Sequence, residues 1–302
     1  MEIALKITSG NFNPVQITFL RFLMGSFVLI GPALIGLKKR GCKLSANDFA
    51  FFSLTGFICV VVSMMLYQLA ILYTPAAIVA VLFSCNPVFV VFFSFIILHE
   101  KIYRFTLVST AISIAGMVVI MNPLKIAASP TGITLTILAA IAFALYSVVS
   151  RTRSERYGGI ALTCFSFLAG SVELLLFSLI AKTGAAANLL SHSAFKEFAN
   201  INFLQGITLQ TLPGLIYVGI FVTGLGYAFY FIAMEKTSAV TASIVFFIKP
   251  ALAPLLALAI IGEPITFTLV AGILIIVAGT LVSFIFGSKS KNQMEPKAIS
   301  RN

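Results

Sequence analysis

The sequence predicts an all-α protein that crosses a lipid membrane many times. Of its 302 residues, 60% are hydrophobic and only 10% are charged, whereas an ordinary soluble domain has roughly 25% charged residues. The hydrophobic residues form long continuous runs, without the alternating pattern of a membrane β-barrel. Backbone polar groups in lipid must be paired within the chain, so such runs predict membrane-spanning helices.

Nine runs are long enough to span a bilayer, which takes about 20 apolar residues. They cover residues 17–37, 49–72, 76–98, 103–121, 131–150, 160–181, 210–234, 239–261 and 265–286. The connections between them are short except for residues 182–209, and residues 287–302 form a polar tail.

The positions of the basic residues predict the orientation of these helices. The loops at 38–43 and 151–156 are rich in Lys and Arg and fall on the same side of the membrane as the tail. The opposite side holds fewer basic residues, namely Lys6, Arg21, Lys125, Lys182 and Lys196. Because cytoplasmic loops carry the excess of positive charge, we expect the C-terminus in the cytoplasm and the chain in the cell membrane.

The chain matches itself when it is shifted by 163 residues. The matched pairs include Tyr67 and Tyr230, Phe83 and Phe246, Pro87 and Pro250, Glu100 and Glu263, and Gly116 and Gly279. Glu100 falls on the cytoplasmic side and Glu263 on the outside, so the two copies are expected to have opposite orientations. Inverted repeats are typical of transporters, because two similar packings can exchange which side is open. Channels also use such repeats.

The two predicted copies occupy residues 1–122 and 131–286, and residues 287–302 form a cytoplasmic tail. The second copy contains five runs and the first only four. The symmetry favours a first helix that lies mostly upstream of Met1, with residues 1–6 as its end. A chain of nine spans with its N-terminus outside is the alternative.

The repeated motif is a span with a central proline, a closing glutamate and a span with an Ala-Gly pair. Its first copy reads Asn86-Pro87, Glu100 and Ala115-Gly116, and its second reads Lys249-Pro250, Glu263 and Ala278-Gly279. These residues resemble the drug/metabolite transporter superfamily, specifically its EamA-type family, over residues 17–286. The resemblance implies ten helices in two inverted five-helix repeats, and export or exchange of small metabolites such as amino acids. The chain has no phosphate-binding G-x4-G-K-[ST] loop, and no cofactor is expected.

Two ionisable residues stand out because they lie near the middle of their runs, where such groups are costly and suggest function by default. Lys249 is predicted either to bind a substrate carboxylate or act in gating, or to be a structural cation held by backbone carbonyls. Glu173 is predicted either to carry a proton or pair with a cation, or to be a buried neutral acid.

Pro87 and Pro250 are candidate hinges, because proline removes a backbone donor and kinks a helix; their alternative role is to shape the helices. Helical spacing places each on a face of mixed character. The two faces are Val79, Phe83, Asn86 and Val90, and Ala242, Phe246, Lys249 and Ala253. Such a mixture suits an amphipathic organic substrate better than a bare ion.

Several polar aromatic residues within the runs are candidates for the wall of the same pathway, or for packing, because a buried hydroxyl needs a partner. They are Tyr67, Tyr146, Tyr227 and Tyr230, and Gln68 is a further candidate. Tyr73, Tyr103 and Tyr157 fall at the ends of runs, where aromatic residues anchor helices at the interface. Glu100 and Glu263 are expected to cap the helices that follow them, with a part in transport chemistry as the alternative.

The sequence argues against an enzyme. An intramembrane serine protease needs a histidine base, but the two histidines, His99 and His192, lie outside the centres of the runs. An aspartyl protease needs two aspartates, and Asp48 is the only one. No cluster of metal ligands appears, and the four cysteines show no paired spacing, so they are expected to be free thiols. A lipid translocator remains the closest alternative to a metabolite transporter.

The expected partners are a small-molecule substrate and the lipid bilayer, with a homodimer as one arrangement to consider. No nucleic acid partner is expected, although the net charge is +11. The basic residues fall in short loops between apolar runs, which is the pattern of membrane orientation.

Overall fold

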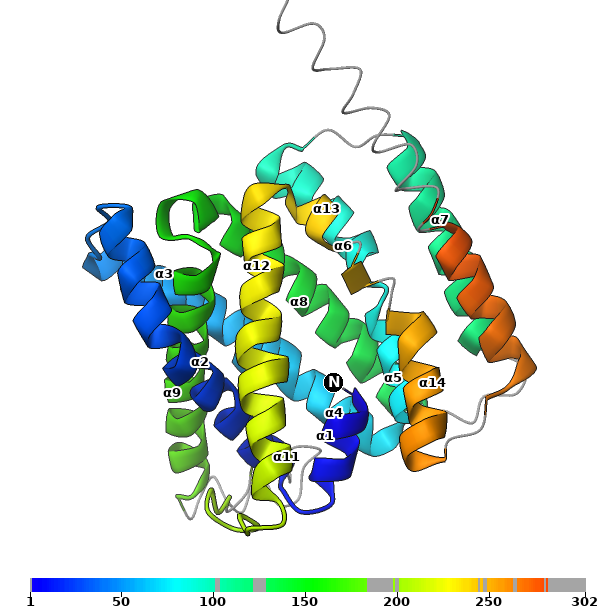
Figure 1. Cartoon of the computed structure of the whole chain (residues 1–302), viewed down its shortest axis with the longest axis horizontal. Helices are drawn as coiled ribbons and strands as arrows, with labels where there is room; N and C mark the ends of the chain where they lie inside the picture. Colours follow the sequence, from blue (N-terminus) through cyan, green and yellow to red (C-terminus); the bar gives the residue numbers. More distant parts are fainter. Residues whose placement is uncertain are drawn as a thin grey trace, which may run out of the picture.

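The computed structural model describes residues 2–100, 104–121, 129–183, 198, 201–243, 245–246, 249–262, 265–279 and 281. Within these ranges the regular elements are all helices (Figure 1), which confirms the all-α prediction. Several predicted features lie outside the described residues: Tyr103, His192, Glu263, the side chains of Lys249 and Pro250, most of the connection 182–209 and the C-terminal tail.

Six helical segments in the described part are long and apolar enough to cross a membrane. They are Pro14–Lys39, Ala46–Tyr73, Ala76–Leu98, Pro130–Tyr157, Gly159–Ala181 and Leu212–Lys236. Three further predicted runs correspond to shorter helices. They are α7 (Arg104–Met121), the pair α13 (Ala239–Ser243) and α14 (Lys249–Ile261), and the unlabelled helix Phe267–Gly279. The protein is therefore a multi-pass membrane protein, and six of the nine predicted spans are found at full length.

Some of the long segments change helical type along their length. The second consists of α3 (Ala46–Gly56), the π-helical η1 (Phe57–Met64) and α4 (Met65–Tyr73). The third consists of α5 (Ala76–Phe83), α6 (Asn86–Phe93) and the π-helical η2 (Ser94–Leu98). The sixth consists of α11 (Leu212–Ile216), the π-helical η4 (Tyr217–Leu225) and α12 (Gly226–Lys236). Departures from α-helical geometry inside a helix occur frequently at functional sites.

The uninterrupted segments are α2 (Pro14–Lys39), α8 (Pro130–Tyr157) and α9 (Gly159–Ala181), and a short helix α1 (Glu2–Ser9) precedes them. The start of α2 shows why it begins where it does. Asn13 Oδ1 accepts from the Val15 N–H at 2.8 Å, and the Asn13 N–H donates to Gln16 Oε1 at 3.2 Å. This capping box satisfies backbone donors that the helix leaves free. Pro14, whose ring suits the first helical position, follows it.

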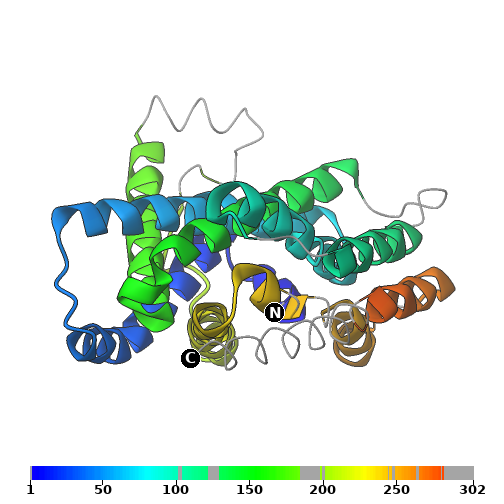
Figure 2. The same ribbon diagram turned by 90° about the horizontal axis from the view of Figure 1, so that it is seen from above.

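Helix α8 runs through the middle of the molecule behind α12 (Figure 1), and it packs against α4, η1, α5 and α6. Helices α2, α3 and α9 pack together at one end of the molecule, and α7 and the helix Phe267–Gly279 lie side by side at the other (Figures 1 and 2). The main hydrophobic core includes residues of α2, α3 and α9 as well as of the central helices, and it draws on both halves of the sequence.

Glycines permit the closest helix contact at the α3–α9 crossing. A Cβ on Gly56 would lie 2.3 Å from the Ser166 carbonyl oxygen and 2.5 Å from the Gly170 backbone nitrogen. A Cβ on Gly170 would lie 2.5 Å from the Gly56 carbonyl oxygen. Small residues at such crossings allow two backbones in a membrane to approach closely.

Two side chains lie elsewhere than predicted. Arg21 of α2, expected at the outer surface, is fully buried, and its guanidinium packs over the Phe22 ring. Tyr157, expected as an interface anchor, is only 1% exposed; its ring packs against Phe52 and its hydroxyl donates to Asp48 Oδ1 at 2.6 Å. Tyr73 is 43% exposed, as expected for an anchor at the end of a span.

Candidate functional site

Aromatic rings from several spans meet in the centre of the molecule. Phe143 of α8 is their hub, and its ring centroid lies 5.5–6.0 Å from those of five others: Phe83, Tyr146, Tyr227, Tyr230 and Phe246. Tyr67 joins the group through Phe83 at 4.7 Å. We call these seven residues the aromatic cluster. It brings together six of the predicted pathway residues, and it unites both halves of the chain.

The aromatic cluster is closed in this structure. The most exposed member, Tyr230, has 9% of its surface exposed, and Tyr67, Phe83, Phe143 and Tyr146 have none. Most contacts are tilted or edge-to-face, the geometry that aromatic pairs prefer. Their hydroxyls have polar neighbours: Tyr227 donates to Met64 Sδ at 3.2 Å, and Tyr146 lies next to Ser150 and Ser166.

The break between α5 and α6 carries the first candidate hinge. Asn86 and Pro87 begin α6, so the proline follows the break and leaves the ladder of α6 intact. Asn86 Nδ2 donates to the Ala140 carbonyl of α8 at 3.1 Å. Among the described residues, Asn86 Oδ1 has no hydrogen-bond partner, although the side chain is fully buried. A buried acceptor left unpaired is costly, so this oxygen is available to a ligand.

The helix face beside Pro87 lies inside the molecule. Its residues Val79, Phe83, Asn86 and Val90 are all fully buried. The second copy shows a parallel arrangement: Lys249 and Pro250 begin α14, as Asn86 and Pro87 begin α6. Ala242, Phe246 and Ala253 on that face are also buried.

Glu173 lies apart from the aromatic cluster. It is half-buried on α9 and accepts a hydrogen bond from the Ser53 hydroxyl of α3. Its Oε2 is buried without a hydrogen-bond partner in the described part of the chain. The structure therefore places this predicted proton carrier at the α3–α9 interface, near the Gly56–Gly170 crossing.

One residue of the aromatic cluster, Phe143, gave little signal in the sequence. Phe143 is one of 29 phenylalanines, and nothing in an apolar run distinguishes a hub from a residue facing lipid. Gln68 was a candidate, and its burial is complete. Neither of its amide atoms has a hydrogen-bond partner among the residues that the structure describes. An unpaired amide inside a membrane protein is a further candidate ligand contact.

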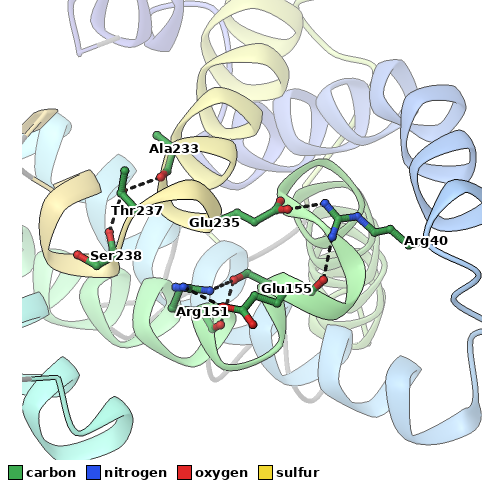
Figure 3. Close-up of polar contacts among 8 residues, drawn as sticks. Arg40, Arg151, Glu155, Ala233, Glu235, Thr237 and Ser238 are labelled. Carbon is green, nitrogen blue, oxygen red and sulfur yellow. Dashed lines mark hydrogen bonds and ion pairs between the residues drawn. The ribbon is translucent and has the colours of Figure 1, made fainter. Parts of the chain in front are cut away.

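Polar contacts join several helices on the side of the molecule that carries the basic loops (Figure 3). Arg40, at the end of α2, pairs with Glu235 of α12 and donates to the Glu155 carbonyl of α8 at 2.8 Å. Glu235 Oε2 accepts from the Gly159 N–H at 2.7 Å and thereby caps α9. A carboxylate at a helix N-terminus is favourable, so Glu235 holds three helices together.

Asp48 forms a second junction on the same side. Its carboxylate accepts from the Tyr157 hydroxyl, from Arg156 Nη2 at 2.8 Å and from the Ser45 N–H at 2.8 Å. It therefore ties the start of α3 to the end of α8. In the described residues no group of three His, Cys, Asp or Glu side chains could hold a metal ion.

Glu100, the closing acid of the first repeat, lies just beyond η2. Partial burial raises the pKa of its carboxyl above the usual range, although Arg151 and the Ala239 backbone N–H act in the opposite direction. Ala239 is the first residue of α13. The carboxyl thus faces a helix start in the second half of the chain. The cap predicted for the helix that follows Glu100, α7, would involve residues 101–103, which lie outside the described residues.

Comparison with known proteins gives a consistent family. Residues 2–122 and 130–285 match the model of the EamA-like transporter family. An uncharacterized transporter of Clostridium kluyveri is 37% identical over 289 residues, which cover 94% of this chain and 87% of the relative. A probable terminal-alkyne amino-acid exporter of Streptantibioticus cattleyicolor is 22% identical and covers 93% and 87% of the two chains.

A solved crystal structure has the same fold. It superimposes with a TM-score of 0.67 at 18% sequence identity and covers 95% of each chain. At this level of identity the similarity concerns the fold alone.

Proposed function

Because this chain belongs to the EamA-like transporter family, we propose that it is a secondary transporter that exports or exchanges small organic metabolites through the aromatic cluster. The observation that carries this proposal is the meeting of rings from both halves of the chain in the buried centre. Buried, unpaired amide atoms belong to Gln68 and Asn86, which are close in sequence to Tyr67 and Phe83. Ligand sites are mostly apolar, with a few convergent polar groups that fix orientation. Tyr67, Tyr146, Tyr227, Tyr230, Phe83, Phe246, Asn86 and Lys249 are the proposed pathway residues.

Contacts between equivalent residues support an inverted repeat. Met64 and Tyr227, which are 163 positions apart, are in contact, and so are Phe83 and Phe246. Two copies related by a two-fold axis bring equivalent positions together where they meet that axis. Such an axis in the membrane plane is what an inverted repeat requires.

The Gly116 and Gly279 pair adds a reciprocal contact. A Cβ on Gly116 would lie 2.8 Å from the Gly272 carbonyl oxygen, and one on Gly279 would lie 3.0 Å from the Ser109 carbonyl oxygen. Gly272 and Ser109 are themselves 163 positions apart. Each glycine thus packs on the equivalent of the other's partner, as expected for two similar helices crossing at an axis.

Alternating access is the proposed mechanism. The cluster is closed to both sides here, so this conformation corresponds to an occluded state between the two open ones. The starts of α6 and α14, with Pro87 and Pro250, are the proposed hinges. Glu173, half-buried between α3 and α9, is the proposed proton carrier. The basic side with Arg40 and Asp48 is taken as cytoplasmic.

Flux measurements in proteoliposomes test this function. Labelled amino acids and related metabolites are offered with and without a pH gradient, and protein-free liposomes serve as the control. Saturable flux of at least one compound is expected, and Glu173→Gln should remove any dependence on the gradient. The absence of flux for every soluble compound, together with movement of a fluorescent phospholipid between leaflets, would replace this proposal by lipid translocation.

A further inference from the structure

The most unusual group in the membrane part of the chain is Arg21. It is the eighth residue of α2, about 10 Å below the start of that helix at a rise of 1.5 Å per residue. It is the largest of the side chains with no exposed surface. An arginine near a helix end usually extends its charged group to the interface, whereas this one remains inside.

The charge on Arg21 is permanent. A guanidinium stays protonated in proteins, and charged side chains within membrane-spanning helices are costly and rare. A lysine in the same place can lose its proton and a glutamine carries no charge, so arginine is a costly choice if only shape is needed. Intramembrane arginines mark ion and substrate pathways for this reason.

Arg21 also lies beside the aromatic cluster. Its Cζ is 4.7 Å from the centroid of the Phe22 ring, and that ring contacts Tyr227 of the cluster at 6.0 Å. The Cys59 thiol, on η1, is an electrostatic neighbour of the guanidinium, and Tyr146 is close to the same thiol. The cation therefore borders the rings on the side of α2 and η1.

We propose that Arg21 binds the anionic group of the transported compound while the aromatic cluster holds its apolar part. This inference rests on the proposed function and specifies its substrate class: an amphipathic organic acid or zwitterion with a carboxylate. The planar fork of a guanidinium matches a carboxylate with two parallel hydrogen bonds. Asn86 Oδ1 and the Gln68 amide supply uncharged contacts for the remaining polar atoms of such a ligand.

Ligand-induced thermal stabilisation of the detergent-purified full chain tests the inference with matched probes. The probes are L-phenylalanine, L-leucine and L-methionine, each beside its amino alcohol, in which an uncharged hydroxymethyl group replaces the carboxylate. At least one acid should raise the Tm in a saturable manner, at a concentration at least about tenfold below that of its alcohol. Arg21→Gln should abolish this preference by weakening the acid alone, and Arg21→Lys should retain part of it.

Each of the other outcomes argues that Arg21 does not bind the carboxylate. Equal binding of acids and alcohols by the unmodified protein, or no stabilisation by any acid, overturns the inference even if Arg21→Gln fails to fold. So does a folded Arg21→Gln protein that keeps the preference. The transport proposal fails separately: a protein that prefers the acids but carries none of them in proteoliposomes has the anion site without the transport function.

Discussion

The rings of Phe83 and Phe246 lie with their centroids 6.1 Å apart at an interplanar angle of 71°, although 163 residues separate them in sequence. Phe83 is the last residue of α5, and Phe246 lies between α13 and α14; both contact Phe143. The two halves of the chain therefore meet through these aromatic residues and share a third ring from α8.

This relationship predicts energetic coupling between the two phenylalanines. Phe83→Leu and Phe246→Leu should each lower the Tm. The double variant should lower the Tm by less than the sum of the two single decreases. Aromatic pairs contribute about 0.5–1.5 kcal/mol beyond their buried area, and residues in contact are not additive. A double-mutant cycle of thermal unfolding measures the coupling, and strict additivity would contradict it.

Removal of the hub should open a cavity within the site. Phe143→Ala is expected to cost about 3–5 kcal/mol of stability, as for other buried phenylalanines, and to allow bulkier substrates. Phe229→Ala, on neighbouring α12, is the matched control because Phe229 is 66% exposed. Thermal unfolding and competition for flux by substrates of increasing size measure both effects. If both variants have the same stability and the same substrate-size preference, Phe143 is not part of the substrate site.

The Gly56–Gly170 contact should tolerate no side chain. Gly56→Ala places a methyl group 2.3 Å from the Ser166 carbonyl oxygen, and such overpacking costs about 1–3 kcal/mol or more. Gly36→Ala is the control, since a Cβ there meets nothing within 4 Å. In the control, the free energy of unfolding should rise by about 0.5–1 kcal/mol, the usual advantage of alanine over glycine within a helix. If thermal unfolding gives the same sign for both, the close approach of α3 and α9 is wrong.

The contacts of Glu235 should hold the basic side closed. Glu235→Gln removes the charge that pairs with Arg40 and caps α9, so the turn that follows Arg40 should loosen. Cys42 in that turn is partly exposed, whereas Cys59 and Cys164 are buried. Its labelling by a maleimide should become severalfold faster. Glu155→Gln is the control, because that glutamate is 80% exposed and pairs only within its own helix. An unchanged rate in Glu235→Gln would show that the pair does not restrain the turn.

Glu100 should make stability depend on pH. Its pKa is raised in the folded protein, so its protonated form is the one that the fold favours. Its stabilising contribution is complete below the unfolded pKa, about 4.3, and is lost as the pH rises through the folded value. The Tm of the unmodified protein minus that of Glu100→Gln should therefore decrease with rising pH. If this difference in Tm instead grows with pH, the pKa of Glu100 is lowered in the folded protein and the prediction is wrong.

Patterns along the chain were sufficient to predict the class of protein and to select several candidate residues. Continuous apolar runs predicted helices, and the matched motif at an offset of 163 singled out Phe83, Asn86 and Phe246, which lie in the buried centre. Helical spacing also placed Val79, Phe83, Asn86 and Val90 on one face, and all four are buried in the structure. Both signals are local: one depends on the polarity of successive residues and the other on residues three or four positions apart.

The tertiary structure decided which of many similar residues form the site. In a sequence with 29 phenylalanines, an apolar side chain facing lipid and one facing the core look alike, since lipid is as apolar as the core. Only packing distinguishes Phe143 in the centre from Phe229 on the surface. The same holds for charge: the sequence marked Glu173 and Lys249, but only the packed structure shows that Arg21 is fully buried. The sequence by itself determined that the chain is helical and membrane-spanning, and the contacts between distant helices determined where its polar groups meet.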